Sequence, residues 1–302
     1  MTSTGSEANG SPRIRGIGTV GDNPGLESSV VVLIDGVYRS RAGIGLKELC
    51  EIDRVDRIEV LRGPQGTLGG RNSSAGLISV VSKRPSFTFG ANGEVTYGNF
   101  DFWRLAAGVT GPISETLAFR LDGVYVKRDG FYNDRTNDTT INDRDRFFGR
   151  AQLVFEPTDA ISFRLIGDYT KRDESCCAAS YVSPSMNEFI GNLTTPVGSV
   201  NAGVAAGSNG NNIINVLRDL GQNLGAFNQN YSRDVSVTPG RSYGGKMEDW
   251  GVSGQLDWDF GGVKLTSITA YRDYYNTQAG DVDYGTVDIL YNANDGNNRR
   301  QF

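Results

Sequence analysis

The 302-residue sequence contains no histidine, only three cysteines, and no uninterrupted apolar run of about 18 residues. Without histidine, the chain lacks the commonest general base and the commonest transition-metal ligand, and no Ser/His/Asp or Cys/His constellation can form. We therefore expect no enzyme, no cofactor and no metal site. The missing apolar run excludes a transmembrane helix. It does not exclude membrane-spanning strands, which need only about 9–11 residues, with every second one facing lipid.

The sequence also has no excess of positive charge, since its formal net charge at pH 7 is −5. This balance argues against a nucleic-acid partner. The first residues show neither a basic start nor an apolar segment of the kind that export signals carry. The last residues, Asn297–Phe302, look like the opening of a further strand. We therefore expect the chain to be truncated at both ends.

The most informative segment that is present runs from Asp56 to Val81 and is rich in glycine. Arg57 to Leu61 alternates polar and apolar residues, Gly63-Pro64 interrupts that pattern, and Leu77 to Val81 resumes a β-branched run. The glycines between the two runs permit tight turns and close backbone approach. The segment therefore predicts a strand, a glycine-rich turn and a second strand.

This segment resembles the plug domain of TonB-dependent outer-membrane receptors. Ile14-Arg15-Gly16 is similar to an earlier plug signature of that family, and Val30–Tyr38 is similar to its central plug strand and turn. All three occur in the order and spacing of the family. The sequence departs from the family pattern at Gly69, where an aromatic residue is usual, so the packing there is expected to differ.

Beyond Pro85 the pattern changes to long segments with a period of two. Leu117, Phe119, Leu121 and Tyr125 would share one face of a strand, and Arg120 and Asp122 the other. Aromatic residues gather near the expected strand ends, as in the girdles of membrane barrels, and short connections alternate with long polar ones. The pattern predicts seven strands, near residues 89–97, 102–110, 116–128, 146–156, 160–172, 247–260 and 263–278.

The expected fold is therefore mainly β, with a small α+β plug domain followed by antiparallel strands of an incomplete transmembrane β-barrel. We expect residues 1–11 to be a disordered tail, residues 12–85 a partial plug domain, and residues 86–302 the N-terminal part of the barrel. Residues 173–245 would form a long outer loop, with some helical spacing at 211–220.

Other motifs are weaker. Residues 16–21 match a dinucleotide-binding fingerprint, but Asp22-Asn23-Pro24-Gly25 stands where its helix should begin, so a turn is expected. Cys176 and Cys177 lie in an expected oxidising compartment, which favours a vicinal disulfide or bridges to cysteines elsewhere. Cys50 is expected to be buried in the plug.

The resemblance implies a receptor of the bacterial outer membrane that takes up a scarce ligand, most simply a ferric siderophore, with energy supplied by the TonB complex. Its partners would be outer-membrane lipid, a small-molecule ligand and that complex, although the coupling box is not found in this sequence. Outward plug loops suggest Asp22, Asn23, Arg39 and Arg41 as ligand contacts, because arginine suits an anionic ligand. Pairing of these arginines with barrel or loop carboxylates is the alternative.

Glu59 and Arg62 are charges within the expected plug and would anchor it to the barrel wall or bind each other. Two other functions remain open. One is a passive porin or adhesin-like barrel without energised transport, which the plug signatures disfavour. The other is a soluble carbohydrate-binding β protein, in which a second sheet would have to cover the outward apolar faces.

Overall fold

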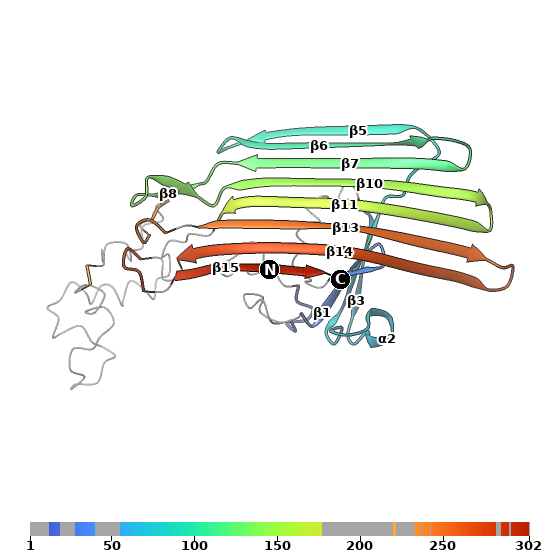
Figure 1. Cartoon of the computed structure of the whole chain (residues 1–302), viewed down its shortest axis with the longest axis horizontal. Helices are drawn as coiled ribbons and strands as arrows, with labels where there is room; N and C mark the ends of the chain where they lie inside the picture. The colour runs from blue at the N-terminus through green and yellow to red at the C-terminus, as the bar shows by residue number, and fades with distance from the viewer. Residues whose placement is uncertain are drawn as a thin grey trace.

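The computed structural model describes residues 12–18, 28–39, 55–176, 220–221, 233–235, 237–241, 243–281, 285–289 and 291–301. These residues form β-structure and connections, with one short helix, α2 (Gly66–Gly69). A long sheet runs across the molecule and a small sheet lies against one of its faces (Figure 1). In this part of the chain, no helix is both long enough and apolar enough to cross a membrane.

The small sheet has four strands in the order β2-β1-β4-β3. Its central strands, β1 and β4, are parallel, and β2 and β3 each run antiparallel to their neighbour. The β1 sequence VVVLI is buried almost throughout, as expected for a central strand covered on both faces. The strand bounds are β1 Val30–Ile34, β2 Val37–Arg39, β3 Val55–Arg62 and β4 Gly76–Ser82.

Residues from the first plug-like signature belong to the core of this small sheet. Ile14 is buried together with Val30, Ile34 and Val80. Gly76 makes this packing possible, because its φ is +153° and an added Cβ would lie 2.5 Å from Cδ1 of Ile14. Residues from all three plug-like signatures therefore share one core.

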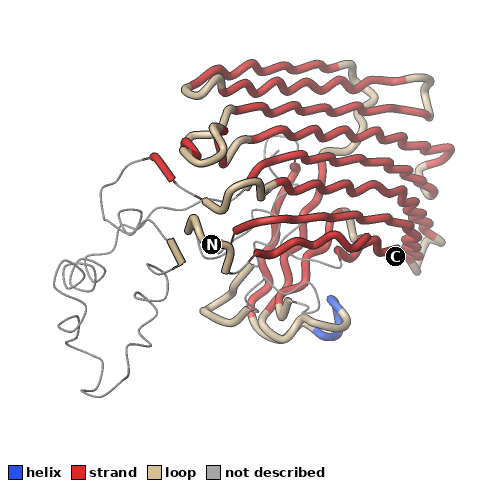
Figure 2. Tube along the Cα trace, turned by 60° about the vertical axis from the view of Figure 1, so that its left-hand side comes forward, coloured by secondary structure: helices blue, strands red, loops and turns tan. Residues whose placement is uncertain are grey.

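The long sheet contains eight antiparallel strands in the order β15-β14-β13-β11-β10-β7-β6-β5. Figure 2 shows how the strands follow one another across it. All seven strands expected from the alternating pattern are present, with ends shifted by a few residues. The bounds are β5 Gly90–Gly98, β6 Phe102–Pro112, β7 Leu117–Arg128, β10 Arg144–Thr158, β11 Ile161–Ser175, β13 Gly244–Asp259, β14 Lys264–Asp281 and β15 Tyr291–Gln301.

The eighth strand, β15, corrects the sequence interpretation, which counted seven strands and placed the opening of a further strand only at Asn297–Phe302. Its sequence, YNANDGNNRRQ, has almost no apolar residue, so it carries no alternation from which a strand could be recognised. It pairs with β14 by register over residues such as Tyr274 and Arg300. Backbone pairing with the edge of β14 therefore defines this strand.

The long connections also contain structure that was not expected. Strands β8 (Tyr132–Asp134), β9 (Thr139–Ile141) and β12 (Asp234–Val235) form a three-stranded sheet at the end of the molecule that carries the long connections. A small apolar core of Ile141, Val235, Val237 and Tyr243 supports it. Strands of two or three residues are too short to show a period. The predicted helical spacing at 211–220 lies outside the described residues, apart from residue 220.

The two faces of the long sheet differ as the alternation predicts. On β7, Leu121 is 48% exposed, whereas Arg120 and Asp122 are 9% and 6% exposed. On β11, Leu165 is exposed and Arg164 is buried. The predicted face assignment is therefore confirmed. The polar face is the one that meets the small sheet.

Exposed aromatic residues form two rows on the apolar face. An outer row, near the long connections, contains Tyr97, Trp103, Phe147, Tyr169, Trp250 and Tyr271, which contact one another in pairs such as Tyr97–Trp103 at 4.8 Å between centroids. A second row on the same face, near the short turns, contains Phe155, Trp258 and Phe260. On β10 and on β13 the two rows are eight positions apart.

Candidate functional site

The site begins at the turn between β1 and β2, where Asp35 and Gly36 occupy the left-handed region with φ of 51° and 77°. This is the aspartate–glycine hairpin turn, which places positive φ at both central residues. The turn points at the long sheet, because a Cβ on Gly36 would lie 2.6 Å from Cδ1 of Ile268 on β14. The Asp35 carboxylate is buried at this junction.

Asp35 is held first by its own sheet. Its carboxylate accepts a hydrogen bond from the Ser82 backbone N–H at 2.9 Å and another from the Ser82 hydroxyl at 2.7 Å. Ser82 ends β4, which lies beside β1 in the small sheet. The carboxylate is therefore held by its own sheet as well as by the long sheet.

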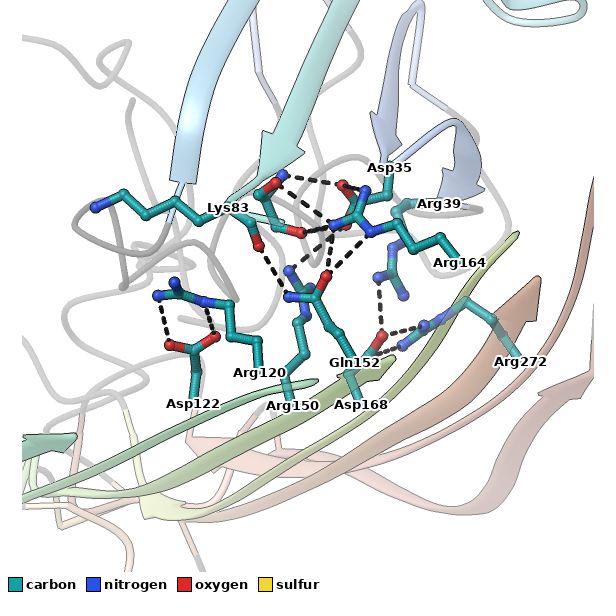
Figure 3. A network of polar contacts seen from close by, with 11 residues as sticks. Asp35, Arg39, Lys83, Arg120, Asp122, Arg150, Gln152, Arg164, Asp168 and Arg272 are labelled. Carbon is teal, nitrogen blue, oxygen red and sulfur yellow. Dashed lines mark hydrogen bonds and ion pairs between the residues drawn. The ribbon is translucent and has the colours of Figure 1, made fainter. Parts of the chain in front are cut away.

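From the long sheet, Arg164 on β11 reaches the same point (Figure 3). Its guanidinium donates to the Ser82 hydroxyl at 2.8 Å and lies 3.3 Å from an Asp35 oxygen. Gln152 on β10 accepts from Arg164 at 2.6 Å and donates to the Lys83 carbonyl at 3.1 Å. Arg150 adds an ion pair to Asp35 at 3.6 Å.

A second junction lies beside the first and involves two arginines and two aspartates. Arg272 on β14 donates to Asp168 at 2.7 Å and to Asp249 at 2.6 Å, all within the long sheet. Arg39 of the small sheet approaches the same two carboxylates at 3.8 and 3.9 Å. All four side chains are less than a tenth exposed. A buried charge needs a partner of this kind.

These junctions share a property that affects how the two sheets can part. If the sheets separated, Asp35 would keep its bonds to Ser82, and Arg164 would keep Gln152. Asp168 and Asp249 would likewise keep Arg272. The ion pairs that join the sheets are longer, between 3.3 and 3.9 Å, while the hydrogen bond from Arg164 to the Ser82 hydroxyl, at 2.8 Å, is the short contact that separation would break. Separation would break contacts between the sheets without leaving Asp35, Asp168 or Asp249 unpaired.

The structure places only some of the residues that the sequence suggested. Asp22, Asn23 and Arg41 lie outside the described residues. Arg39 is buried between the sheets, paired with carboxylates of the long sheet, which is the alternative considered from the sequence. A contact between any of these four and a ligand stays a prediction.

Glu59 and Arg62 lie on β3 and are exposed. Glu59 accepts a hydrogen bond from Arg57 at 2.8 Å, and among the described residues neither side chain has a hydrogen bond or ion pair with the long sheet. Their role as a plug anchor stays a prediction. In the described part of the chain, Asp35, Arg39, Ser82 and Lys83 make polar contacts with the long sheet. The only sequence signals for them were the Asp35-Gly36 turn and the charge of Arg39.

The other candidate residues give less information. Cys176 is disulfide-bonded, while Cys177 and Cys50 lie outside the described residues, so the predicted Cys176–Cys177 pairing stays a prediction. Within the described ranges, no group of three or more acidic or cysteine side chains is arranged to hold a metal ion.

Comparison with known proteins gives the same architecture. A family model described as the TonB-dependent receptor plug domain matches residues 1–77. A ferrioxamine receptor from Yersinia enterocolitica is 30% identical over 117 residues, which are 39% of this chain and 16% of the receptor. A ferric-pyoverdine receptor from Pseudomonas putida is 30% identical over 115 residues, or 38% of this chain and 14% of that protein.

Solved structures extend the likeness to most of the chain. The ferric yersiniabactin uptake receptor of Yersinia pestis aligns with a TM-score of 0.59 and 16% identity, covering 84% of this chain and 33% of the receptor. A siderophore receptor from Acinetobacter baumannii aligns with a TM-score of 0.58 and 16% identity, covering 91% of this chain and 32% of that receptor. At such identities the likeness concerns the fold. The chain thus corresponds to about a third of each of these structures.

Proposed function

The chain belongs to the TonB-dependent receptors of the bacterial outer membrane, and on this premise we propose that the complete receptor carrying it takes up a ferric siderophore with energy from the TonB complex. The small sheet is then part of the plug, and the long sheet is part of the barrel wall. We propose residues 12–85 and 86–302 as the corresponding domains. This proposal involves no covalent chemistry on the cargo.

The observation that carries this proposal is the junction between plug and wall. An energised receptor must hold its plug in place at rest and yet let it move when it is pulled. The buried junction provides the holding contacts through Asp35, Arg39 and Arg164. Because each side keeps hydrogen bonds of its own after separation, the plug can move without stranding Asp35, Asp168 or Asp249 unpaired.

The names of the relatives support an iron chelate as cargo. The two relatives compared are a ferrioxamine receptor and a ferric-pyoverdine receptor, and the two structures are siderophore receptors. The inserted plug disfavours a passive porin, since it occupies the space beside the wall. A soluble carbohydrate-binding protein would need a second sheet over the outward apolar face, whose side chains, Leu121 and Leu165 among them, are exposed.

The test is uptake by the complete receptor in a host that lacks its own siderophore receptors. Cells would be supplied with radioactive iron bound to each of several siderophores, with and without an uncoupler of the proton gradient. We expect accumulation of at least one iron chelate, abolished by the uncoupler. Accumulation that persists with the uncoupler would indicate a passive pore, and the absence of uptake of every chelate would contradict iron transport.

A further inference from the structure

Three long connections at one end of the wall contact one another. They are residues 129–143 between β7 and β10, residues 176–243 between β11 and β13, and residues 282–290 between β14 and β15. Figure 1 shows β8, from the first connection, at this end of the long sheet. β12 of the second connection pairs in parallel with β8, and the N–H of Arg135 donates to the Val235 carbonyl at 2.9 Å. We call the described residues of 131–141, 233–243 and 285–289 the outer cap.

The Asn137 side chain joins the first two connections. Its Oδ1 accepts a hydrogen bond from the Gly240 N–H at 2.8 Å. Its Nδ2 donates to the Asp134 carboxylate at 2.6 Å and to the Thr238 carbonyl at 3.4 Å. Asp134 is 2% exposed, and its other oxygen accepts from the Thr136 N–H at 3.0 Å. Asn137 therefore uses its acceptor and both its donors within the outer cap.

Asp281, the last residue of β14, fixes the outer cap to the wall. One of its carboxylate oxygens accepts from the Thr238 N–H at 3.0 Å, the Thr238 hydroxyl at 2.9 Å and the Tyr243 hydroxyl at 3.2 Å. Asp281 is 3% exposed, so these hydrogen bonds stabilise a carboxylate that is almost fully removed from water. The third connection is joined to the second, because Arg241 donates from Nε to Asp288 at 3.1 Å.

An apolar core lies within the outer cap. Ile141 comes from the first connection, and Val235, Val237 and Tyr243 come from the second, and each is less than a tenth exposed. Strands of two or three residues are not stable by themselves, since even an isolated hairpin is at best marginally stable in water. Their stability depends on this shared core and on the hydrogen bonds between the connections. Opening one connection would expose core residues of another, which makes the outer cap a single cooperative unit.

We propose that the outer cap opens and closes as one unit, and that the buried carboxylate of Asp281 holds it on the wall. A conformational change in any one connection then changes the population of the closed form in all three. A molecule that bound only to the first connection would thereby move the third, although the two are far apart in the sequence. This inference concerns the movement of the connections, and it does not depend on which molecule the receptor takes up.

Hydrogen–deuterium exchange of the complete receptor in detergent tests this proposal. Peptides that contain residues 131–141, 233–243 and 285–289 report on the three connections separately. In the wild type we expect backbone amides that are bonded between connections, such as those of Arg135 and Gly240, to exchange with one common opening free energy. Peptides from β10 and β11 should be better protected and would show that the wall is folded.

Asp281→Ala removes the carboxylate that holds the outer cap. The hydrogen bonds of Asp281 to Thr238 and Tyr243 go to the second connection, so the effect on the first should pass through the contacts between connections. We expect exchange in residues 131–141 to become about tenfold or more faster, the usual effect of losing a hydrogen bond to a charged group. The factor should be the same in residues 233–243. Asn137→Ala, in the first connection, should in turn speed up exchange in residues 285–289.

Asp173→Ala is the matched control, because Asp173 lies at the same end of the wall, but its side chain is 47% exposed and pairs with Lys246 outside the outer cap. Exchange in all three segments should equal that of the wild type. Faster exchange in residues 233–243 alone after Asp281→Ala, or different opening free energies in the wild type, would overturn the inference. If exchange in β10 and β11 shows that Asp281→Ala does not fold, Asn137→Ala gives the decision, because Asn137 lies outside the long sheet. Unchanged exchange in residues 233–243 and 285–289 of that variant would equally overturn the inference.

Discussion

Asp143 is a carboxylate that the fold holds in an unfavourable place. It is half-buried beside the start of β10, and this burial raises its pKa above the usual carboxyl value. Repulsion from Glu174 and Asp145 adds to the rise, while a hydrogen bond from the Ser175 backbone N–H opposes it. When the pKa of a carboxyl is higher in the folded state than in the unfolded state, the fold is most stable at low pH, where the carboxyl is protonated. That stability is lost as the pH rises through the folded-state pKa.

We therefore predict that Asp143→Asn raises the unfolding temperature of the complete receptor at neutral pH and has no effect well below the carboxyl pKa. The amide oxygen can still accept from Ser175, but it carries no charge to bury. Thermal unfolding over a series of pH values measures this difference. Asp138→Asn, at an exposed turn of the same connection, should change the unfolding temperature by the same amount at every pH. A lower unfolding temperature for Asp143→Asn at neutral pH would show that the carboxylate charge is needed.

Single residues also show how far the sequence could predict the site. The Asp35-Gly36 dipeptide marks a turn, and alternation places Arg164 on the inner face. The contact between them, however, joins residues 129 positions apart, and Asp35 and Ser82 are 47 positions apart. No local pattern encodes a partner at such a separation. Arg39 illustrates the same limit, because its charge suggested an anionic partner without indicating that wall carboxylates provide one.

Among the described elements, the β1–β2 turn fits closely against the wall. Gly36 combines a positive φ with a Cβ position only 2.6 Å from Ile268. We predict that Gly36→Ala destabilises the receptor by about 1–2 kcal/mol for the left-handed backbone alone. The overlap with Ile268 should add to this cost.

The double variant Gly36→Ala with Ile268→Ala tests the two causes separately. Ile268 is 41% exposed, so its truncation alone should cost little. Removing the Ile268 side chain should recover the part of the loss due to overlap and leave the backbone cost. Unfolding free energies of the two single variants and the double variant measure the coupling. Strict additivity would mean that the turn does not touch the wall in solution.

Strand prediction succeeded where one face is apolar and failed where pairing alone defines the strand. β7 and β11 show a clear period of two, because one face is exposed and apolar and the other meets the plug. β15 has no such contrast, and β8, β9 and β12 are only two or three residues long. Their formation depends on an existing edge or on a small core assembled from distant segments.

For the whole molecule, the main prediction concerns the exposed apolar surface, which we propose faces lipid. Leu121 lies on the exposed apolar face, and Leu121→Arg should destabilise the complete receptor by about 2–4 kcal/mol if it lies near the bilayer midplane. Folding titrations into lipid vesicles would measure this loss. Asp159→Arg, in the exposed turn between β10 and β11, should cost about 0–1 kcal/mol, as expected near an interface. Equal costs at the two positions would contradict the membrane orientation.

Asp122→Arg, at the position next to Leu121, should cost more stability than the alternation of polar and apolar residues alone suggests. Asp122 accepts hydrogen bonds from Arg120 at 2.7 and 2.9 Å, and both side chains are buried. Its replacement by arginine would leave Arg120 without this partner and add a second cation. A residue on the inner face can therefore be sensitive to substitution even though it does not face lipid.

The spacing of the two aromatic rows gives the height of the apolar band between them. Eight positions at about 3.3 Å each, on strands tilted by about 40°, correspond to roughly 20 Å across the membrane. This is less than the roughly 30 Å hydrocarbon thickness of a typical bilayer. On the proposal that this face meets lipid, the lipid around the wall would thin to match it, at a cost of fractions of a kcal/mol per Å of mismatch. The bacterial outer membrane is thinner than average, so this mismatch penalty is smallest in the compartment to which the receptor belongs.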